Sequence, residues 1–166
     1  MKKLLLLAII SSTLYTSAQD DVSTKGYTET EKEIILTIEN LFKGMQTSDS
    51  ALVHSTFHNS VSMRTTYVSK KTNKLMMKQE NLKDFLTAIA TPKKELWNER
   101  ISNLIIHVDG NLAQTWMDYS FYIDDHFSHC GVNSIQLIRL EDGWKISDIA
   151  DTRRRDECLP PGSEKK

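Results

Sequence analysis

The chain has 166 residues, a formal net charge of −1 and 39% hydrophobic residues. This length fits one domain with a hydrophobic core of its own, and the near-neutral charge gives no support for nucleic-acid binding. The sequence contains no internal repeat and no low-complexity segment.

The first eighteen residues are typical of a secretory signal peptide. Lys2-Lys3 form a basic start, an apolar run follows from Leu4 to Ile10, and Thr16-Ser17-Ala18 provides a small-residue cleavage site. The apolar run is far shorter than the roughly 20 residues that a membrane span needs. We therefore predict a signal peptide over 1–18 and a periplasmic or secreted protein without a membrane span.

Three amphipathic helices are expected after a flexible arm over 19–28. Thr28 or Thr30 can cap the first helix, which begins near Glu31. Its apolar residues recur at three- and four-residue steps, which predicts one buried face: Ile34, Ile35, Ile38, Leu41, Phe42 and Met45. A second, shorter helix is expected after the polar run 47–50. The third starts after Asn81 and ends at Thr91, because the residue before a proline disfavours helical geometry.

The remaining runs predict β-strands. Two short strands, 61–68 and 74–79, lie between the second and third helices, and four longer ones follow at 96–108, 112–124, 132–140 and 144–152. Asp109-Gly110 and Glu141-Asp142-Gly143 supply the turn chemistry between them. The order of elements predicts an α+β domain over 29–158, with helices on one face of a curved antiparallel sheet and a disordered tail at 159–166.

The two cysteines suggest one disulfide. A hairpin about residues 141–143 would pair Leu140 with Trp144 and would place Cys130 opposite Arg154. A chain that turns back after Arg155 then brings Cys158 near Cys130. In an oxidising compartment the two would be bridged, provided that their Cα atoms come within about 7 Å.

Several local motifs resemble the nuclear transport factor 2-like superfamily over roughly 29–158. They are the strand entry Phe57-His58-Asn59-Ser60-Val61, the helix motif Asp84-Phe85-Leu86 and the closing strand Asp142-Gly143-Trp144-Lys145-Ile146. The segments 129–134 and 151–154 resemble its exported bacterial SnoaL-like or "putative lumazine-binding" branch. The resemblance implies a cone of curved sheet around helices, a pocket at the open end and homodimers through the outer sheet face. Ketosteroid isomerase, scytalone dehydratase, polyketide cyclases and binding modules share this fold, so it does not define the chemistry.

The hairpin register predicts which side chains line a pocket. One face of the sheet changes from apolar near Trp144 to polar near Gln136 and Asp148, as small-molecule sites require. A slip of one residue would exchange the two faces. The expected pocket residues are Tyr67, Thr115, Met117, Tyr119, Gln136, Ile138, Trp144 and Ile146.

Asp148 is the candidate catalytic residue. Apolar neighbours in the strand would desolvate its carboxyl group and raise its pKa, which suits a proton carrier. Alternatively, the carboxylate is simply hydrogen-bonded at the end of the sheet. His54 and His58 are weaker candidates for a general base, and His126, His129 and Cys130 are interpreted as a hairpin tip and not as a metal site. No motif for a cofactor or a metal is present.

Three functions remain open. The favoured one is an exported protein that binds a small apolar or aromatic ligand in the cone. The second is an isomerase, dehydratase or cyclase in which an Asp or a His carries a proton. The third is a dimeric interaction module that uses the outer face of the sheet around Trp116 and Tyr122.

Overall fold

The computed structural model describes residues 26–91 and 94–159, so the expected signal peptide, most of the arm and nearly all of the tail lie outside the described residues. Three helices and six strands follow in the predicted order. Their bounds are α1 Glu29–Gln46, α2 Ser50–Thr56, β1 Phe57–Val68, β2 Leu75–Glu80, α3 Leu82–Ala90, β3 Trp97–Asp109, β4 Leu112–Ile123, β5 His126–Leu140 and β6 Gly143–Arg153. None of the helices in these two ranges is long and apolar enough to cross a membrane.

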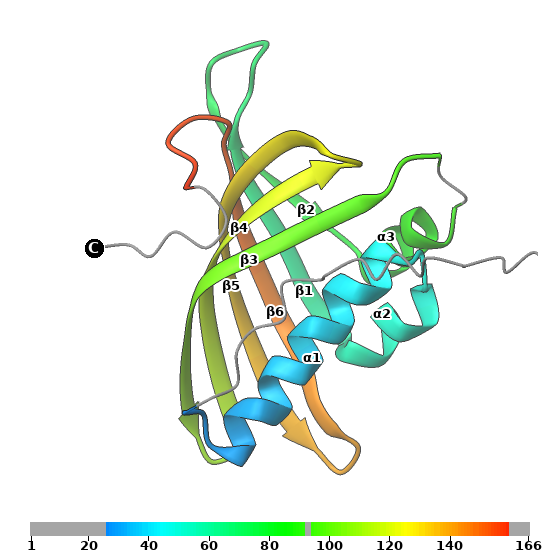
Figure 1. The fold of residues 1–166 in the computed structure, drawn as a ribbon, viewed down its shortest axis with the longest axis vertical. Coiled ribbons are helices and arrows are strands. Elements are labelled where there is room, and N and C mark those ends of the chain that lie inside the picture. The colour runs from blue at the N-terminus through cyan, green and yellow to red at the C-terminus, as the bar shows by residue number, and fades with distance from the viewer. Residues whose placement is uncertain (1–25, 92–93, 160–166) are drawn as a thin grey trace, which may run out of the picture.

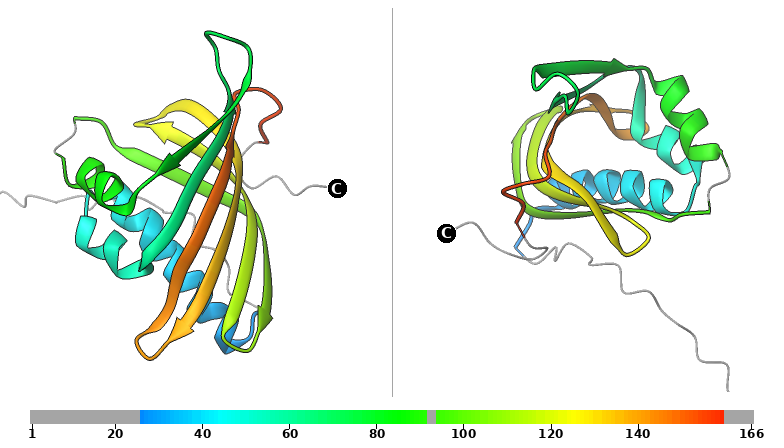
Figure 2. Two further views of the ribbon diagram at one scale, coloured as in Figure 1. Left: turned by 180° about the vertical axis from the view of Figure 1, so that it is seen from behind. Right: turned by 90° about the horizontal axis from the view of Figure 1, so that it is seen from above.

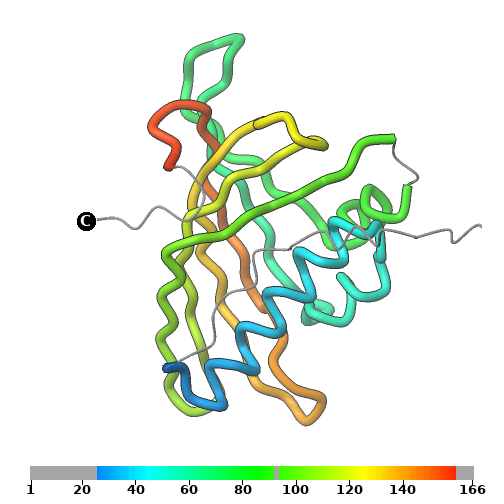
Figure 3. The backbone as a smooth tube through the Cα atoms, in the orientation of Figure 1, coloured from blue at the N-terminus to red at the C-terminus, as the bar shows by residue number. Residues whose placement is uncertain are grey.

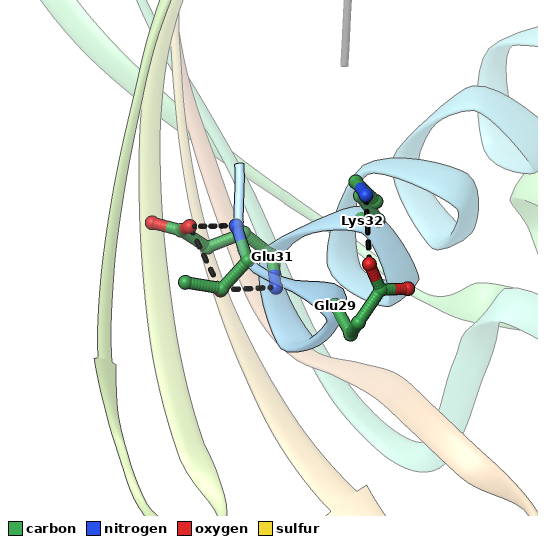
Figure 4. A network of polar contacts seen from close by, with 4 residues as sticks. Glu29, Glu31 and Lys32 are labelled. Atoms are coloured by element: carbon green, nitrogen blue, oxygen red, sulfur yellow. Dashed lines mark hydrogen bonds and ion pairs between the residues drawn. The ribbon is translucent and has the colours of Figure 1, made fainter. Parts of the chain in front are cut away.

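Helix α1 begins with a capping box (Figure 4). The Thr28 hydroxyl accepts a hydrogen bond from the Glu31 backbone N–H at 3.3 Å, and the Glu31 carboxylate accepts one from the Thr28 N–H at 2.8 Å. Thr28 is therefore the cap, rather than Thr30. The predicted apolar face of α1 is buried against the sheet, with Ile34 and Ile38 fully excluded from solvent.

The six strands form one strongly curved sheet that wraps around α1 (Figures 1 and 2). The strand order is β2-β1-β6-β5-β4-β3, and the backbone trace in Figure 3 shows α1 crossing the hollow side of the sheet. Neighbouring strands are antiparallel, as expected, except that β1 and β6 run parallel. The long connection through β2, α3 and the β3–β5 meander makes this possible, because parallel neighbours require a crossover.

The β5–β6 hairpin contains a bulge that the predicted register did not include. Near the turn, Leu140 pairs with Gly143 and Leu137 with Ile146, one residue away from the predicted register. The irregularity lies at Ser147, after which Gln136 pairs with Asp148 as predicted. An extra residue in one strand reverses its inward and outward positions. Trp144 and Ile146 therefore face the core, as do Ile149 and Asp151, whereas Asp148 faces outward.

The segment that follows β6 is connected to β5 by the predicted disulfide. Cys130 pairs with Arg154 across a single antiparallel bridge, and Cys130 and Cys158 are bonded with their Cα atoms 5.8 Å apart. Within the described residues neither cysteine is free. This bond ties the segment after β6 to β5.

Candidate functional site

A cavity of about 630 Å³ opens between the curved sheet and the helices α1 and α3. Residues of α1, α3 and all six strands line the cavity, and most of the inner surface is apolar. Aromatic and long aliphatic side chains form this apolar part: Leu41, Phe42, Met45, Phe57, Met63, Phe85, Trp97, Phe121, Ile123 and Ile149. Such a surface favours a flat or branched apolar molecule, which would leave water on entering.

Asp151 is the centre of the polar wall. Its carboxylate accepts a hydrogen bond from the Thr65 hydroxyl at 2.5 Å and another from the Tyr119 hydroxyl at 3.1 Å. Burial raises the pKa of Asp151, while the two hydrogen bonds and the nearby Arg153 act in the opposite direction. The Ser147 bulge turns Asp151 inward, so this carboxylate enters the cavity wall only because the strand is irregular.

Glu99 is the second carboxylic acid of the wall. It occupies an inward position of β3 opposite Phe121, and it accepts a hydrogen bond from the Asn133 side-chain amide at 2.7 Å. Burial, and secondarily the charge of Asp151, raises its pKa from the ordinary 4.5 to about 7, against the lowering effect of the Asn133 bond. Glu99 therefore exchanges a proton near neutral pH, as general acids and bases do.

Tyr119 and His129 complete the polar wall as neutral groups. Burial and the two carboxylates raise the pKa of Tyr119, so its hydroxyl remains a donor. Burial, with the charges of Arg153 and Arg155, lowers the pKa of His129 to about 4. The neutral imidazole stacks on Phe121 with ring centroids 4.9 Å apart.

Gly131 makes this arrangement sterically possible. It lies opposite Tyr119 in the β4–β5 ladder, and a Cβ atom at this position would come within 2.6 Å of the Tyr119 ring. The ring passes over the glycine, so that the Tyr119 hydroxyl reaches across β5 and donates to the Thr152 carbonyl at 2.9 Å. Because Gly131 has no side chain, the Tyr119 hydroxyl can reach β6 and bind there.

Charged side chains surround the opening of the cavity. Lys78 is paired with Glu80 at the base of the β1–β2 hairpin, and Arg155 donates from Nε to the Ser128 carbonyl at 3.0 Å. Arg153 is exposed and also contributes to the cavity surface. The cavity therefore combines an apolar interior, a wall with two protonatable carboxylic acids and an opening with basic side chains.

The structure brings together few of the residues predicted for the pocket. Tyr119 lies in the cavity wall. Four others are buried in the core away from the cavity: Thr115, Met117, Trp144 and Ile146. Gln136 is exposed, Ile138 and Tyr67 are half-buried, and none of these three lines the cavity. Asp148 points outward and forms an ion pair with Arg64.

The reason for this difference is the register. Strand β4 presents Thr115, Met117 and Tyr119 inward as predicted, but β5 presents Asn133, Ile135 and Leu137 inward instead of Gln136 and Ile138. The turn between β5 and β6 is one residue shorter than the predicted pairing assumed, and this exchanges the faces of β5.

Sequence reasoning did not identify Glu99, Asn133 or Asp151. One signal was available for Glu99: a charged residue occupies an inward position between Trp97 and Ile101 in an alternating strand. Burial of a carboxylate at such a position costs free energy unless the group is paired, hydrogen-bonded or protonated. No comparable signal existed for Asp151, whose inward direction depends on the bulge.

No three His, Cys, Asp or Glu side chains within residues 26–91 and 94–159 are grouped so that they could hold a metal ion.

Comparison with known proteins identifies the family. Residues 29–148 match the family described as "Putative lumazine-binding". No curated protein has a significant sequence similarity to this chain.

Several solved structures share the fold at low identity. A nuclear transport factor 2-like protein from Cytophaga hutchinsonii is 11% identical, with a TM-score of 0.61 over 76% of this chain and 100% of that one. A protein of unknown function with a cystatin-like fold from Nostoc punctiforme is 11% identical, with a TM-score of 0.59 over 76% of this chain and 92% of that one. A "putative dehydratase" of the same fold family from Streptomyces avermitilis is 11% identical, with a TM-score of 0.56 over 75% and 96%.

These likenesses confirm the expected α+β fold and the expected resemblance, while the family match covers most of the chain. The chain belongs to the "Putative lumazine-binding" family and has the nuclear transport factor 2-like, cystatin-like fold.

Proposed function

We propose that this chain is an exported protein that binds a small, largely apolar or aromatic molecule in the cavity of the cone. The observation that carries the proposal is the cavity of about 630 Å³, whose apolar interior ends at one polar wall. Apolar surfaces with a few convergent polar groups are typical of small-molecule sites. The family description supports ligand binding, and the disulfide is compatible with a location outside the cytoplasm.

The polar wall indicates which edge the ligand presents. The carboxylic acids of Glu99 and Asp151 accept hydrogen bonds, and the Tyr119 hydroxyl already donates to its neighbours. A ligand with N–H or O–H donors on one edge would bind the second carboxyl oxygen of Glu99 and the further lone pairs of the two Asp151 oxygens. We therefore expect an apolar body with a hydrogen-bond donor on the edge that meets β3 and β6.

The test uses a tryptophan that narrows the cavity. Ala88 lines the opening from α3, whereas Ala90 lies on the same helix outside the lining, and both are exposed. With Nile red as a neutral fluorescent probe, we expect Ala88→Trp to weaken saturable binding by about tenfold or more, equivalent to about 1.4 kcal/mol. Ala90→Trp should leave binding unchanged. Equal binding by both variants, or no saturable binding by the wild type, would contradict the proposal.

A second candidate function is acid–base catalysis, and the pKa of Glu99 favours it. With a pKa of about 7 inside an apolar cavity, Glu99 can accept and return a proton at neutral pH. The structural similarity to a protein named a "putative dehydratase" also supports acid–base catalysis. Glu99 replaces Asp148 as the preferred proton carrier, because Asp148 faces outward and is paired with Arg64.

Proton exchange can be measured without knowledge of the substrate. With cyclohexanone in D₂O as the probe, NMR reports exchange of the protons next to the carbonyl. An ionised Glu99 acting as base should make the catalysed rate rise as the pH passes about 7, and Glu99→Gln should reduce this rate by about 10² or more. Asp148→Asn serves as the matched control on the outer face and should retain the rate. A rate that is the same with and without the protein would leave binding as the function.

We also propose that the outer face of the sheet forms a homodimer. Three large apolar side chains are about half exposed on β3 and β4: Ile105, Leu112 and Trp116. Ile105 and Trp116 are direct partners in the β3–β4 ladder, so together they form a continuous apolar surface. A second copy would cover this surface by twofold symmetry.

A further inference from the structure

The β1–β2 hairpin extends beyond the rest of the sheet (Figures 1 and 2). Its tip is a closed turn in which Ser69 N–H donates to the Lys74 carbonyl at 2.9 Å and Asn73 N–H donates to the Ser69 carbonyl at 2.8 Å. Asn73 adopts a positive φ of 52°, which Asn tolerates better than most residues. The hairpin is therefore an ordered projection whose side chains have defined directions.

One face of this projection is apolar and exposed. Val68 and Leu75 are direct cross-strand partners, and Met77 follows two residues later on the same side of β2. Their exposed fractions are 56%, 78% and 58%, respectively. Each of these large apolar side chains leaves more than half of its surface in water, so their adjacency indicates a surface that a partner covers.

The same projection is strongly basic. From Thr65 to Gln79 the sequence has lysines at 70, 71, 74 and 78 and no Asp or Glu, in a chain whose net charge is −1. Lys78 is paired with Glu80 at the base, and Lys70, Lys71 and Lys74 are exposed around the tip. The three exposed lysines are adjacent to the apolar face.

We propose that this hairpin docks the protein on an anionic lipid surface. Val68, Leu75 and Met77 insert between the lipid headgroups, and Lys70, Lys71 and Lys74 bind the headgroup phosphates. Each lysine near an anionic bilayer favours binding by electrostatic attraction, and exposed apolar side chains add the free energy of their burial. Lysine stems can lie along the apolar boundary while their ammonium groups remain in water.

The size of the patch favours lipid over an acidic protein partner. A stable protein interface takes about 20 to 30 residues from each side, whereas three apolar residues and three lysines form a much smaller footprint. A lipid surface needs no matching shape and deforms around a projecting ribbon. Residues Lys78, Gln79 and Glu80 of the same hairpin line the cavity, so docking would place one cavity wall close to the lipid.

The test is co-sedimentation with vesicles, using the protein without its signal sequence. With vesicles of phosphatidylcholine and phosphatidylglycerol, we expect binding that weakens as salt increases, because salt screens the lysine contribution. Changing Lys70, Lys71 and Lys74 to Gln should weaken binding by about tenfold or more. Leu75→Ser combined with Met77→Ser should weaken it similarly, and vesicles of phosphatidylcholine alone should bind little.

A matched control separates the hairpin from net charge. Lys32, Lys43 and Lys83 lie on helices α1 and α3, and changing them to Gln removes the same charge elsewhere. This control should retain binding, and circular dichroism should show that every variant is folded. Equal losses for the two lysine triples, or no binding of the wild type to anionic vesicles, would overturn the proposal. Binding to a soluble acidic protein in place of vesicles would also overturn it.

Discussion

Glu99 is the side chain of the cavity wall whose ionisation changes close to neutral pH. Its pKa in the folded protein, about 7, lies above the ordinary value of 4.5, because burial disfavours the carboxylate. The folded state therefore binds this proton more tightly than the unfolded state. The resulting stability is fully present below about pH 4.5 and is lost as the pH rises through about 7.

Replacement of Glu99 by Gln should remove this pH dependence. Gln keeps an oxygen that accepts the Asn133 hydrogen bond but cannot ionise. We expect the two proteins to have similar melting temperatures at pH 5, and the Gln variant to melt a few degrees higher at pH 8. Such a shift corresponds to about 1 kcal/mol in a domain of this size.

His129 does not obscure this comparison. Its lowered pKa makes stability increase with pH between about 4 and 6.5, which is the opposite direction, but both proteins contain it. Glu141→Gln, at the exposed β5–β6 turn, is the control and should melt like the wild type at both pH values. A constant difference between Glu99→Gln and wild type at pH 5 and pH 8 would contradict the assigned pKa.

Gly131 should be the least replaceable glycine of the sheet. A Cβ atom there would lie 1.8 Å from the Thr152 carbonyl oxygen, which is backbone and cannot rotate away. We expect Gly131→Ala to lower the free energy of unfolding by about 3 kcal/mol or more, as measured by urea denaturation. Gly110→Ala is the comparison: it has a positive φ of 56° but no neighbour within 4 Å, and it should cost about 1 kcal/mol. Similar losses for both variants would show that steric overlap at Gly131 is unimportant.

At the scale of elements, the helices could be predicted from the sequence and the strand faces only in part. The apolar residues of α1 follow the helical period without ambiguity, and Asn81 and Thr28 supply the expected caps. In β4, Thr115 and Met117 lie on the inward face as expected, although Leu112 and Trp116 make the outward face partly apolar as well.

Strand β5 is ambiguous because apolar residues occur in both phases. Ile135 and Leu137 face the core, yet Ile138 and Val132 make the opposite phase look equally apolar in sequence. The length of the turn before Gly143 determines which set of alternate β5 residues faces the core. The bulge at Ser147 then exchanges the inward and outward positions along β6. Neither the turn length nor the bulge produces a sequence pattern as clear as a run of apolar residues. The polar wall of the cavity depends on both, and so most of its residues were not predicted.

The disulfide is an element-scale feature with a measurable contribution. It closes a segment of 28 residues that contains the β5–β6 hairpin. Chain entropy predicts a stabilisation of about 3.6 kcal/mol for a closed segment of this length. We therefore expect a reductant to lower the melting temperature of the wild type. The double variant Cys130→Ser with Cys158→Ser should melt at the lower temperature with or without reductant. A wild type that is insensitive to reductant would show that the bond adds little to stability.

At the scale of the whole molecule, the outer sheet face predicts the oligomeric state. Trp116 is 48% exposed beside Ile105, and burial of this pair would stabilise a dimer. We expect the wild type to sediment as a dimer in analytical ultracentrifugation and Trp116→Ala as a monomer. Leu36→Ala, at an equally exposed position on α1, should remain dimeric. A monomeric wild type, or a dimer that persists in Trp116→Ala, would contradict the proposed interface.

The position of β6 in the strand order determines when the molecule can assemble. It is the last of the described strands in the sequence, yet it lies between β1 and β5. Without Gly143–Arg153, the other described strands can pair only as two separate ribbons, each with an unpaired edge prone to aggregation. Contacts of such long range slow folding. The complete sheet therefore forms only when β6 is present, and a deletion that removes β6 leaves two ribbons that cannot join.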